Sequence, residues 1–313
     1  MTLTLAEPLT PAFLDADGSF PGTTAISVVI PAKNEERNIA WVLQRIPNYV
    51  DEVILVDGHS TDRTVEVARA VRPDIRVLVE AARGKGAALR TGFAAATGDV
   101  VVMLDADGSM DPVDIETYVN ALAEGADVAK GSRFLTGGGT ADMTPIRHLG
   151  NRALLIMVNV LYRARFTELC YGYMALRRSG VQSLGLTGSG FEIETEIVVR
   201  SLRVGLRVVE VPSYEAERRF GTSNLNATRD GIRVFRTLLV HRFRRSRAKG
   251  ASGTWVPSQS TSPAPVAAAQ RTTLALVQSA PPSRSPSADT EDRRPEALNQ
   301  ESMALPPQHV PTA

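Results

Sequence analysis

Three aspartates follow a run of apolar residues in the segment DVVVMLDADGSMDP, which spans residues 99–112. Asp105, Asp107 and Asp111 come where a buried strand would end, and buried carboxylates are costly unless they are paired or bind a cation. Two interpretations fit. Aspartate and glycine are common in solvated turns, and carboxylates at the end of a parallel strand are also typical of a cation site at the sheet edge. This segment alone does not decide between them.

The aspartates belong to a regular alternation of strand and helix patterns. The expected strands are residues 26–32, 52–57, 75–80, 99–105, 127–132, 173–177 and 206–211. The expected helices are residues 35–46, a helix capped at Ser60 or Thr61, 86–96, a helix with Pro112 in its first turn, 145–164, 190–203 and 227–246. Apolar strands joined by helices predict an α/β fold with a mainly parallel sheet and helices on both faces.

Polar residues follow three of these strands, in the segments IPAKNEE, VDGHSTD and LDADGS. The carboxyl ends of parallel strands share one edge of a sheet, so these segments should line one crevice. The sequence contains neither G-x-G-x-x-G after the first strand nor the phosphate loop G-x-x-x-x-G-K-[ST]. We therefore expect a nucleotide or phosphate ligand held by carboxylates and a cation, without a glycine-rich cradle.

The length of 313 residues and the hydrophobic content of 43% allow one large domain or two small ones. We expect a flexible lead at residues 1–24, the domain at 25–247, and a disordered tail rich in proline, serine and alanine at 248–313. The formal charge of +1 gives no general reason to expect nucleic acid as a partner. The single cysteine, Cys170, suits a reducing compartment. No segment predicts a signal peptide or a transmembrane helix, so we expect a cytoplasmic protein.

Several segments together resemble family 2 glycosyltransferases, which have the GT-A fold with a Rossmann-like nucleotide-sugar domain. SVVIPAKNEERNI, VILVDGHSTDRT, RGKGAALRTGF and GDVVVMLDADGSMDP occur in the order of that family's motifs. KGSRF, GYMALRR, GFEIETEI and RRFGTSNL resemble its polyprenyl-phosphate branch, which includes dolichol-phosphate mannose synthase. The resemblance covers residues 26–240. It implies inverting transfer of a hexose from a UDP- or GDP-sugar to polyprenyl phosphate, with Mg²⁺ or Mn²⁺ as cofactor.

The resemblance also assigns residues to the nucleotide sugar. Asp105 and Asp107 match the D-x-D motif and, with Ala106, are implied to bind the ribose and the divalent cation. Asp57 matches an aspartate that contacts the base, although many relatives have a second aspartate where this chain has Gly58. The other matched positions are Pro31, Ala32, Glu35 and Lys85. Each of these positions has a structural alternative. The D-x-D segment could be a plain turn, Glu35 could be a charge favoured by a helix N-terminus, and Lys85 could be a solvated lysine.

Three arginines match basic positions that face the donor diphosphate or the acceptor phosphate. They are Arg133, Arg147 and Arg219, and guanidinium groups suit phosphate oxygens. Many relatives have a lysine where this chain has Asn224, so the diphosphate contact is weakened or moves to Arg218. Structural ion pairs are the alternative for the three arginines.

Glu196 completes the implied catalytic set of Asp107, Arg133, Arg219 and Glu196. It matches an acidic position in the helix after GF, whereas Glu192 and Glu194 have no match. Three glutamates spaced by two cannot share one helical face. A hydroxyl acceptor would need a general base within hydrogen-bond reach, and an ionised phosphate acceptor would not. Glu196 is therefore a candidate base or a brace for the arginines.

The identity of the acceptor stays open at this point. The helix at 227–246 combines an apolar stripe with many arginines, which is typical of an interfacial helix at a membrane and also of a packed helix with a solvated face. The absence of a transmembrane pattern leaves peripheral membrane contact at the inner face, or a soluble acceptor such as a small metabolite or natural product. A nucleotidyltransferase and a non-catalytic sugar-nucleotide binding module are more distant alternatives.

Overall fold

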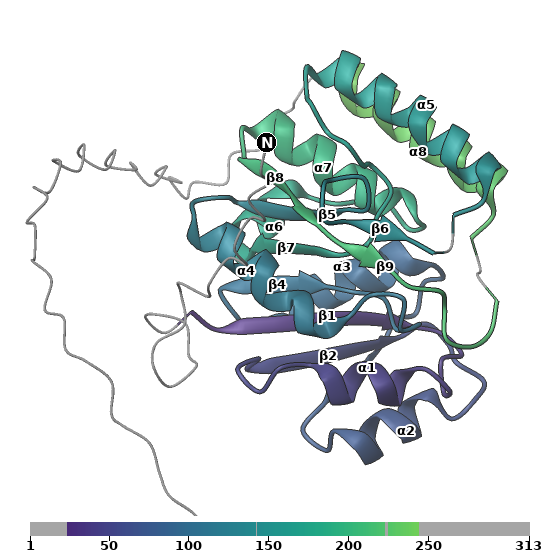
Figure 1. Ribbon diagram of the computed structural model, residues 1–313. Helices are drawn as coiled ribbons and strands as arrows, with labels where there is room; N and C mark the ends of the chain where they lie inside the picture. Colours follow the sequence, from purple (N-terminus) through teal and green to yellow (C-terminus); the bar gives the residue numbers. More distant parts are fainter. Residues whose placement is uncertain (1–23, 142, 223–224, 244–313) are drawn as a thin grey trace, which may run out of the picture. The chain divides into compact units, whose positions relative to one another are not determined.

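Seven strands form the main sheet, in the order β3-β2-β1-β4-β7-β5-β8 (Figure 1). The computed structural model describes residues 24–141, 143–222 and 225–243. The strands are β1 (Ile26–Ala32), β2 (Glu52–Asp57), β3 (Arg76–Val79), β4 (Val100–Met103), β5 (Val128–Ser132), β7 (Met174–Arg177) and β8 (Val208–Pro212). Only β7 runs antiparallel to its neighbours, so the expected mainly parallel sheet is confirmed.

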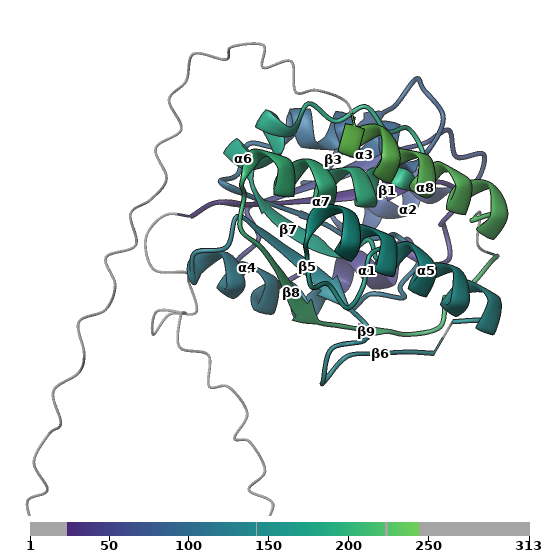
Figure 2. The ribbon, with the colours of Figure 1, turned by 90° about the horizontal axis from the view of Figure 1, so that it is seen from above.

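Helices cover both faces of this sheet (Figure 2). They are α1 (Ile39–Arg45), α2 (Thr64–Val71), α3 (Lys85–Ala95), the 3-10 turn η1 (Pro112–Asp114), α4 (Ile115–Ala123), α5 (Pro145–Tyr162), α6 (Arg178–Leu184), α7 (Glu192–Val204) and α8 (Ala227–Phe243). Val28 and Ile30 of β1 pack in one core with α1, α2 and α4. Val29 points to the other face, where α3 and α5–α8 contribute to a second core. The period-two alternation of a strand therefore divides the hydrophobic residues between two layers.

Two predicted helix starts differ from the structure because polar residues hold the loops in other ways. The helix expected from residue 35 begins at Ile39, since the Glu35 amide donates to the Thr64 hydroxyl at 2.8 Å and the chain turns before α1. Ser60 and Thr61 do not cap α2. The Ser60 hydroxyl accepts from the Asn34 amide at 3.0 Å, and the Asn34 side chain accepts from the Thr61 amide at 2.7 Å. These residues join the β1 and β2 loops to each other.

Three short elements had no sequence prediction. Helix α6 follows β7 directly, and β6 (Gly139–Thr140) pairs in parallel with β9 (Tyr214–Glu215) in a separate two-stranded sheet. Strands of two residues are too short to show a period. The expected tail at 248–313, and all of the expected lead except Thr24, lie outside the described residues. Among the helices of the described ranges, none has the length and apolar content required to cross a bilayer.

The packing of α3 against the sheet can be tested at Gly92. A methyl group there would overlap the side chain of Val29 and lie 3.1 Å from Val56 Cγ2. We expect Gly92→Ala to lower the free energy of unfolding by about 2 kcal/mol, because the helix must move away from the strands. Urea denaturation measures this change.

Gly150→Ala is the matched control, because a methyl group at Gly150 in α5 meets no atom within 4 Å. It should raise the free energy of unfolding by about 1 kcal/mol through helix propensity alone. A Gly92→Ala protein as stable as the wild type would contradict the close packing of α3.

Candidate functional site

A cleft of about 1040 Å³ opens at the carboxyl edge of the sheet. Its walls include Pro31 and Ala32 at the end of β1, Gly58 after β2, and residues 105–107 after β4. The structure therefore brings the three polar strand ends to one place. Other predicted residues that line the cleft are Glu35, Lys85, Arg133 and Arg147.

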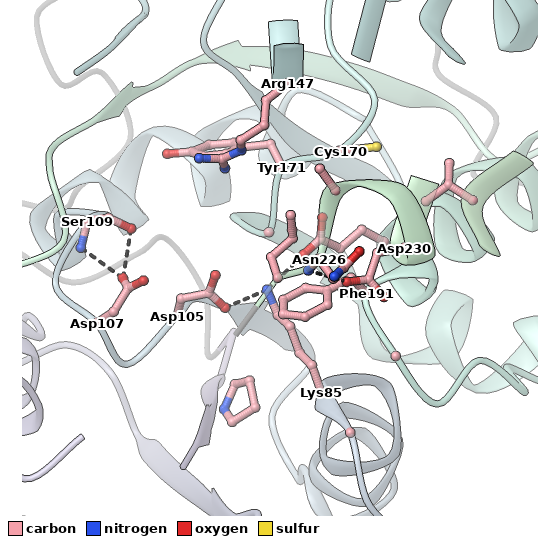
Figure 3. A pocket seen from close by; sticks show the side chains of 18 of the residues that line it. Lys85, Asp105, Asp107, Ser109, Arg147, Cys170, Tyr171, Phe191, Asn226 and Asp230 are labelled. Carbon is pink, nitrogen blue, oxygen red and sulfur yellow. Dashed lines mark hydrogen bonds and ion pairs between the residues drawn. The ribbon is translucent and has the colours of Figure 1, made fainter. Parts of the chain in front are cut away.

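Lys85 lies between two carboxylates that line this cleft, and Figure 3 shows it beside one of them, Asp105. Its Nζ is 2.6 Å from Asp105 Oδ1 and 2.7 Å from Glu194 Oε1. Burial disfavours the charge on the ammonium group, but the two carboxylates outweigh it and raise the pKa of Lys85. Gly172 leaves the room for this cluster, because a methyl group there would lie 2.7 Å from Lys85 Nζ. The lysine is thus an internal counterion, and the solvated alternative is excluded.

Asp105, the first of the two D-x-D carboxylates, has a shifted pKa. Burial raises the pKa of Asp105 to about 6, because the neighbouring charge of Lys85, which lowers the pKa, offsets only part of the desolvation. The nearby carboxylates of Asp107 and Glu194 raise the pKa further. A cation bound beside Asp105 would relieve this cost.

Asp107 is held by the loop that follows β9. Its Oδ2 lies 3.2 Å from Arg218 Nη2, and its Oδ1 accepts from the Ser109 amide at 3.0 Å and from the Ser109 hydroxyl at 2.7 Å. Arg218 also lies 2.8 Å from Glu35 Oε1. Arg218 therefore occupies the centre of a group of cleft carboxylates. Asp111 does not join this group, because it pairs with Arg45 and caps η1 by accepting from the Val113 amide.

Arg219 points to a different place from Arg218. Its guanidinium lies 4.7 Å from the centre of the Trp41 ring, and its side chain packs against Gly108. Gly108 has φ of +76°, and a methyl group there would lie 2.7 Å from Arg219 Cδ. The structure therefore does not bring Arg219 to the cleft wall, and of the two arginines Arg218 is the one that lines it. Asn224 lies outside the described residues.

Arg133 lines the cleft but is engaged by protein groups. Its Nε donates to Glu168 at 2.8 Å, its Nη1 to Glu215 at 2.8 Å, and its Nη2 to the Cys170 carbonyl at 3.1 Å. Burial lowers the pKa of this guanidinium less than the two glutamates raise it. These contacts match the structural ion pair that was the alternative for Arg133, and its contact with a phosphate stays a prediction.

Asp57 lies behind the cleft wall rather than on it. The side chain is buried, and its carboxylate accepts from the Ser60 amide at 3.2 and 3.3 Å. Gly58 lines the cleft instead. Asp57 therefore shapes the β2 loop, and its contact with a base stays a prediction.

Glu196 faces away from the cleft. Its carboxylate accepts from the amides of Thr187 and Gly188, and it lies 2.8 Å from Arg200 Nε and 3.4 Å from His241 Nε2. Burial raises the pKa of this carboxyl, but the hydrogen bonds lower it more, to about 2. Its position gives the general-base prediction no support, because an acceptor in the cleft would be out of reach. Its contacts favour the brace, although it holds Arg200 rather than a cleft arginine.

Glu194, which had no match, is the acidic residue of α7 that reaches the cleft. A spacing of two residues corresponds to about 200° around a helix, so Glu194 and Glu196 must face different sides. The spacing required that one of them face away, but it did not say which. The partner that decides the matter is Lys85, which is more than a hundred residues away in the chain.

The comparisons with known proteins agree with this geometry. The family model described as Glycosyl transferase family 2 matches residues 27–185. The chain belongs to this family. It is 33% identical over 226 residues to glycosyltransferase AglJ of Haloferax volcanii, covering 69% of this chain and 71% of the relative. It is also 33% identical over 210 residues to dolichol-phosphate mannosyltransferase of Pyrococcus furiosus, covering 64% of this chain and 59% of that protein.

Solved structures give the same fold. Glucosyl-3-phosphoglycerate synthase from Mycobacterium tuberculosis, in complex with Mn²⁺, UDP and glucosyl-3-phosphoglycerate, has a TM-score of 0.58 and 26% sequence identity. The alignment covers 72% of this chain and 82% of that one. The same enzyme has been solved with Mg²⁺ and UDP. The protein is therefore a family 2 glycosyltransferase, an enzyme that uses a nucleotide sugar. It has the GT-A fold expected from its sequence.

The brace at Glu196 gives a prediction for stability and its pH dependence. The pKa of Glu196 falls from 4.5 in the unfolded chain to about 2 in the fold, so its charge stabilises the protein fully above pH 4.5. We expect Glu196→Gln to lower the free energy of unfolding at pH 7 by about 3 kcal/mol.

Because the folded pKa is the lower one, this difference should shrink by more than half at pH 3 and vanish below pH 2. Urea denaturation of both proteins at pH 7, 5 and 3 measures it. A difference that does not depend on pH would contradict the assigned charge on Glu196.

Proposed function

We propose that this enzyme transfers a hexose, with inversion, from a UDP- or GDP-sugar to polyprenyl phosphate in a reaction that depends on a divalent cation. The donor would occupy the part of the cleft formed by the ends of β1, β2 and β4. Pro31, Ala32 and Glu35 would line the nucleoside, and residues 105–107 the ribose and diphosphate. The acceptor would enter from the end of the cleft between α5 and α8.

The chemistry of that end supports the lipid phosphate. Arg147 from α5 and Arg229 and Arg233 from α8 line the cleft together with Leu154 and Val234. Arginine suits phosphate oxygens, and the apolar side chains suit a hydrocarbon chain. This combination of cationic and apolar groups is the observation on which the acceptor proposal rests.

The residues present fit a divalent cation held jointly with the donor. Asp105 and Asp107 offer hard carboxylate oxygens, and Mg²⁺ in such sites is bound by one or two carboxylates plus substrate phosphates. In the described ranges, no group of three or more histidine, cysteine, aspartate or glutamate residues could hold a metal without such a substrate. When bound, the cation would neutralise the charge that develops on the leaving nucleoside diphosphate.

The protein's own residues would orient the reactants. Lys85, fixed by Asp105 and Glu194, would keep the first D-x-D carboxylate in place, and Arg218 would supply a positive charge beside the diphosphate. The acceptor phosphate oxygen would attack the anomeric carbon while the bond from that carbon to the donor diphosphate breaks, and the diphosphate keeps the electron pair. An ionised phosphate needs no general base, which agrees with the position of Glu196 outside the cleft.

A soluble acceptor is the second candidate. Glucosyl-3-phosphoglycerate synthase is solved with phosphoglyceric acid, a small anionic molecule. The same arginines could bind such an anion without using the apolar side chains beside them. The purified protein should therefore be given labelled UDP- and GDP-hexoses with either polyprenyl phosphate in detergent or 3-phosphoglycerate, with and without EDTA. Label in the organic phase that EDTA abolishes supports the lipid acceptor. Label only in a water-soluble product would contradict the lipid acceptor and support the soluble one.

Substitutions of Asp107 and of Asp111 should have different effects on the transfer rate in this assay. We expect Asp107→Asn to lower the transfer rate by about a hundredfold, because the leaving diphosphate loses the cation that stabilises it. Asp111→Asn removes a carboxylate of the same segment that faces Arg45, and it should keep transfer near the wild-type rate. Metal-dependent transfer by Asp107→Asn at the wild-type rate would exclude the proposed cation site.

Arg218 should compete with the cation for Asp107. Removing its charge in Arg218→Met leaves Asp107 and Glu35 without their guanidinium partner, so Mn²⁺ alone should bind about tenfold more tightly. Electron paramagnetic resonance of free Mn²⁺ measures this affinity without any turnover. Arg219→Met is the matched control and should bind Mn²⁺ as the wild type does, because Arg219 lies over Trp41. Equal affinities in Arg218→Met and wild type would show that Arg218 does not compete.

A further inference from the structure

Large apolar side chains are exposed on two neighbouring helices, α5 and α8. Their exposed fractions lie between 48% and 72%, and in each helix they fall on one side at helical spacing. Together they form a surface that we name the α5–α8 face: Leu149, Ile156 and Val160 on α5, and Ile232, Phe235 and Phe243 on α8.

The two helices are fixed to each other and to the core by their opposite sides. Val158 of α5 and Val234 and Leu238 of α8 are buried in the same core. The Tyr162 hydroxyl donates to the Leu238 carbonyl at 2.8 Å, and Arg242 Nε donates to the Leu161 carbonyl at 3.0 Å. Figures 1 and 2 show α5 and α8 as an outer pair of helices. The α5–α8 face is therefore a prearranged surface directed away from the core.

The two helices that carry this face are strongly positive, and three of their arginines, Arg147, Arg229 and Arg233, also line the cleft. The two helices contain six arginines and one acidic residue, Asp230. Asp230 is buried and accepts from the Asn226 amide at 2.8 Å, so its charge is directed inward. The arginines are Arg147, Arg152, Arg229, Arg233, Arg236 and Arg242.

We propose that the α5–α8 face docks on the surface of an anionic lipid bilayer. Helices with an apolar side flanked by arginines bind at such surfaces, because the apolar side chains enter the headgroup region while the cations contact anionic lipids. A second copy of the chain is a poorer partner. A two-fold dimer through this face would bring two arginine-rich surfaces together.

Docking would also orient the cleft. Arg147 and Leu154 of α5 and Arg229 and Val234 of α8 line it, so the end of the cleft between the helices would lie near the bilayer. A lipid phosphate in that bilayer could then enter without leaving the membrane. This consequence rests on the proposed function, whereas docking itself does not.

The test measures vesicle binding without donor or acceptor, so a failed transfer assay leaves its result unchanged. The full chain is sedimented with vesicles of phosphatidylcholine mixed with phosphatidylglycerol, and with vesicles of phosphatidylcholine alone. We expect binding to the anionic vesicles and at least tenfold weaker binding to the neutral ones. Absence of binding to the anionic vesicles would overturn the proposal.

Two double variants locate the binding surface. Ile156→Ser with Phe235→Ser should weaken binding at least tenfold, with thermal unfolding confirming that the variant is folded. The matched control is Val79→Ser with Val204→Ser, which removes side chains that are 68% and 53% exposed on β3 and α7, and it should bind as the wild type does. If Ile156→Ser with Phe235→Ser binds as tightly as the wild type, another part of the chain binds the lipid and the proposal is wrong.

Charge is tested by Arg152→Gln with Arg236→Gln, which should weaken binding and reduce its salt dependence. Light scattering of each protein without vesicles tests whether a second copy of the chain covers the α5–α8 face instead. A wild-type dimer that becomes a monomer in Ile156→Ser with Phe235→Ser, with no vesicle binding by either protein, would assign the face to a second copy and overturn the proposal.

Discussion

The cleft depends on how the fold tolerates carboxylates at the carboxyl ends of its central strands. Asp105 follows β4 into a desolvated position, and nearby negative charges make its ionised form more costly. Lys85 offsets that cost by lying between Asp105 and Glu194. Residues from the start of α3, the end of β4 and the start of α7 are therefore held together by charge, and Gly172 leaves the space in which they meet.

A second positive charge does the same for Asp107, but from a loop instead of a helix. Arg218 contacts Asp107 and Glu35, and the neighbouring residues fasten the loop to α1: Arg219 lies over Trp41, and the Phe220 carbonyl accepts from Asn38. Lys85 lies at the start of α3, whereas Arg218 lies on the loop that follows β9. The two D-x-D carboxylates thus have counterions from different elements, Lys85 for Asp105 and Arg218 for Asp107.

The sequence predicted the sheet well because strands that are buried on both faces leave continuous apolar runs. The bounds of β1 and β2 agree with their apolar runs residue by residue, whereas α1 and α2 start later because Asn34 and Thr64 make hydrogen bonds across loops. Motif order placed Asp105 and Asp107 correctly at the cleft. It could not distinguish Arg218 from Arg219, since neighbouring residues of a loop point in directions that only the packing of Trp41 decides.

Motif order also could not decide which glutamate of α7 faces the cleft, and that choice determines whether α7 supplies a general base. Motif matching favoured Glu196, but the contacts of the helix turn Glu196 toward Arg200 and His241 and turn Glu194 toward Lys85. A carboxylate whose pKa is about 2 and which accepts from two loop amides is a poor proton acceptor. Because Glu196 is engaged in structural contacts, it is not available as a general base. An acceptor that is already ionised needs no base, whereas a hydroxyl acceptor would need one from another wall of the cleft. The position of Glu196 therefore supports the proposal of a phosphate acceptor at the end of the cleft lined by Arg147, Arg229 and Arg233.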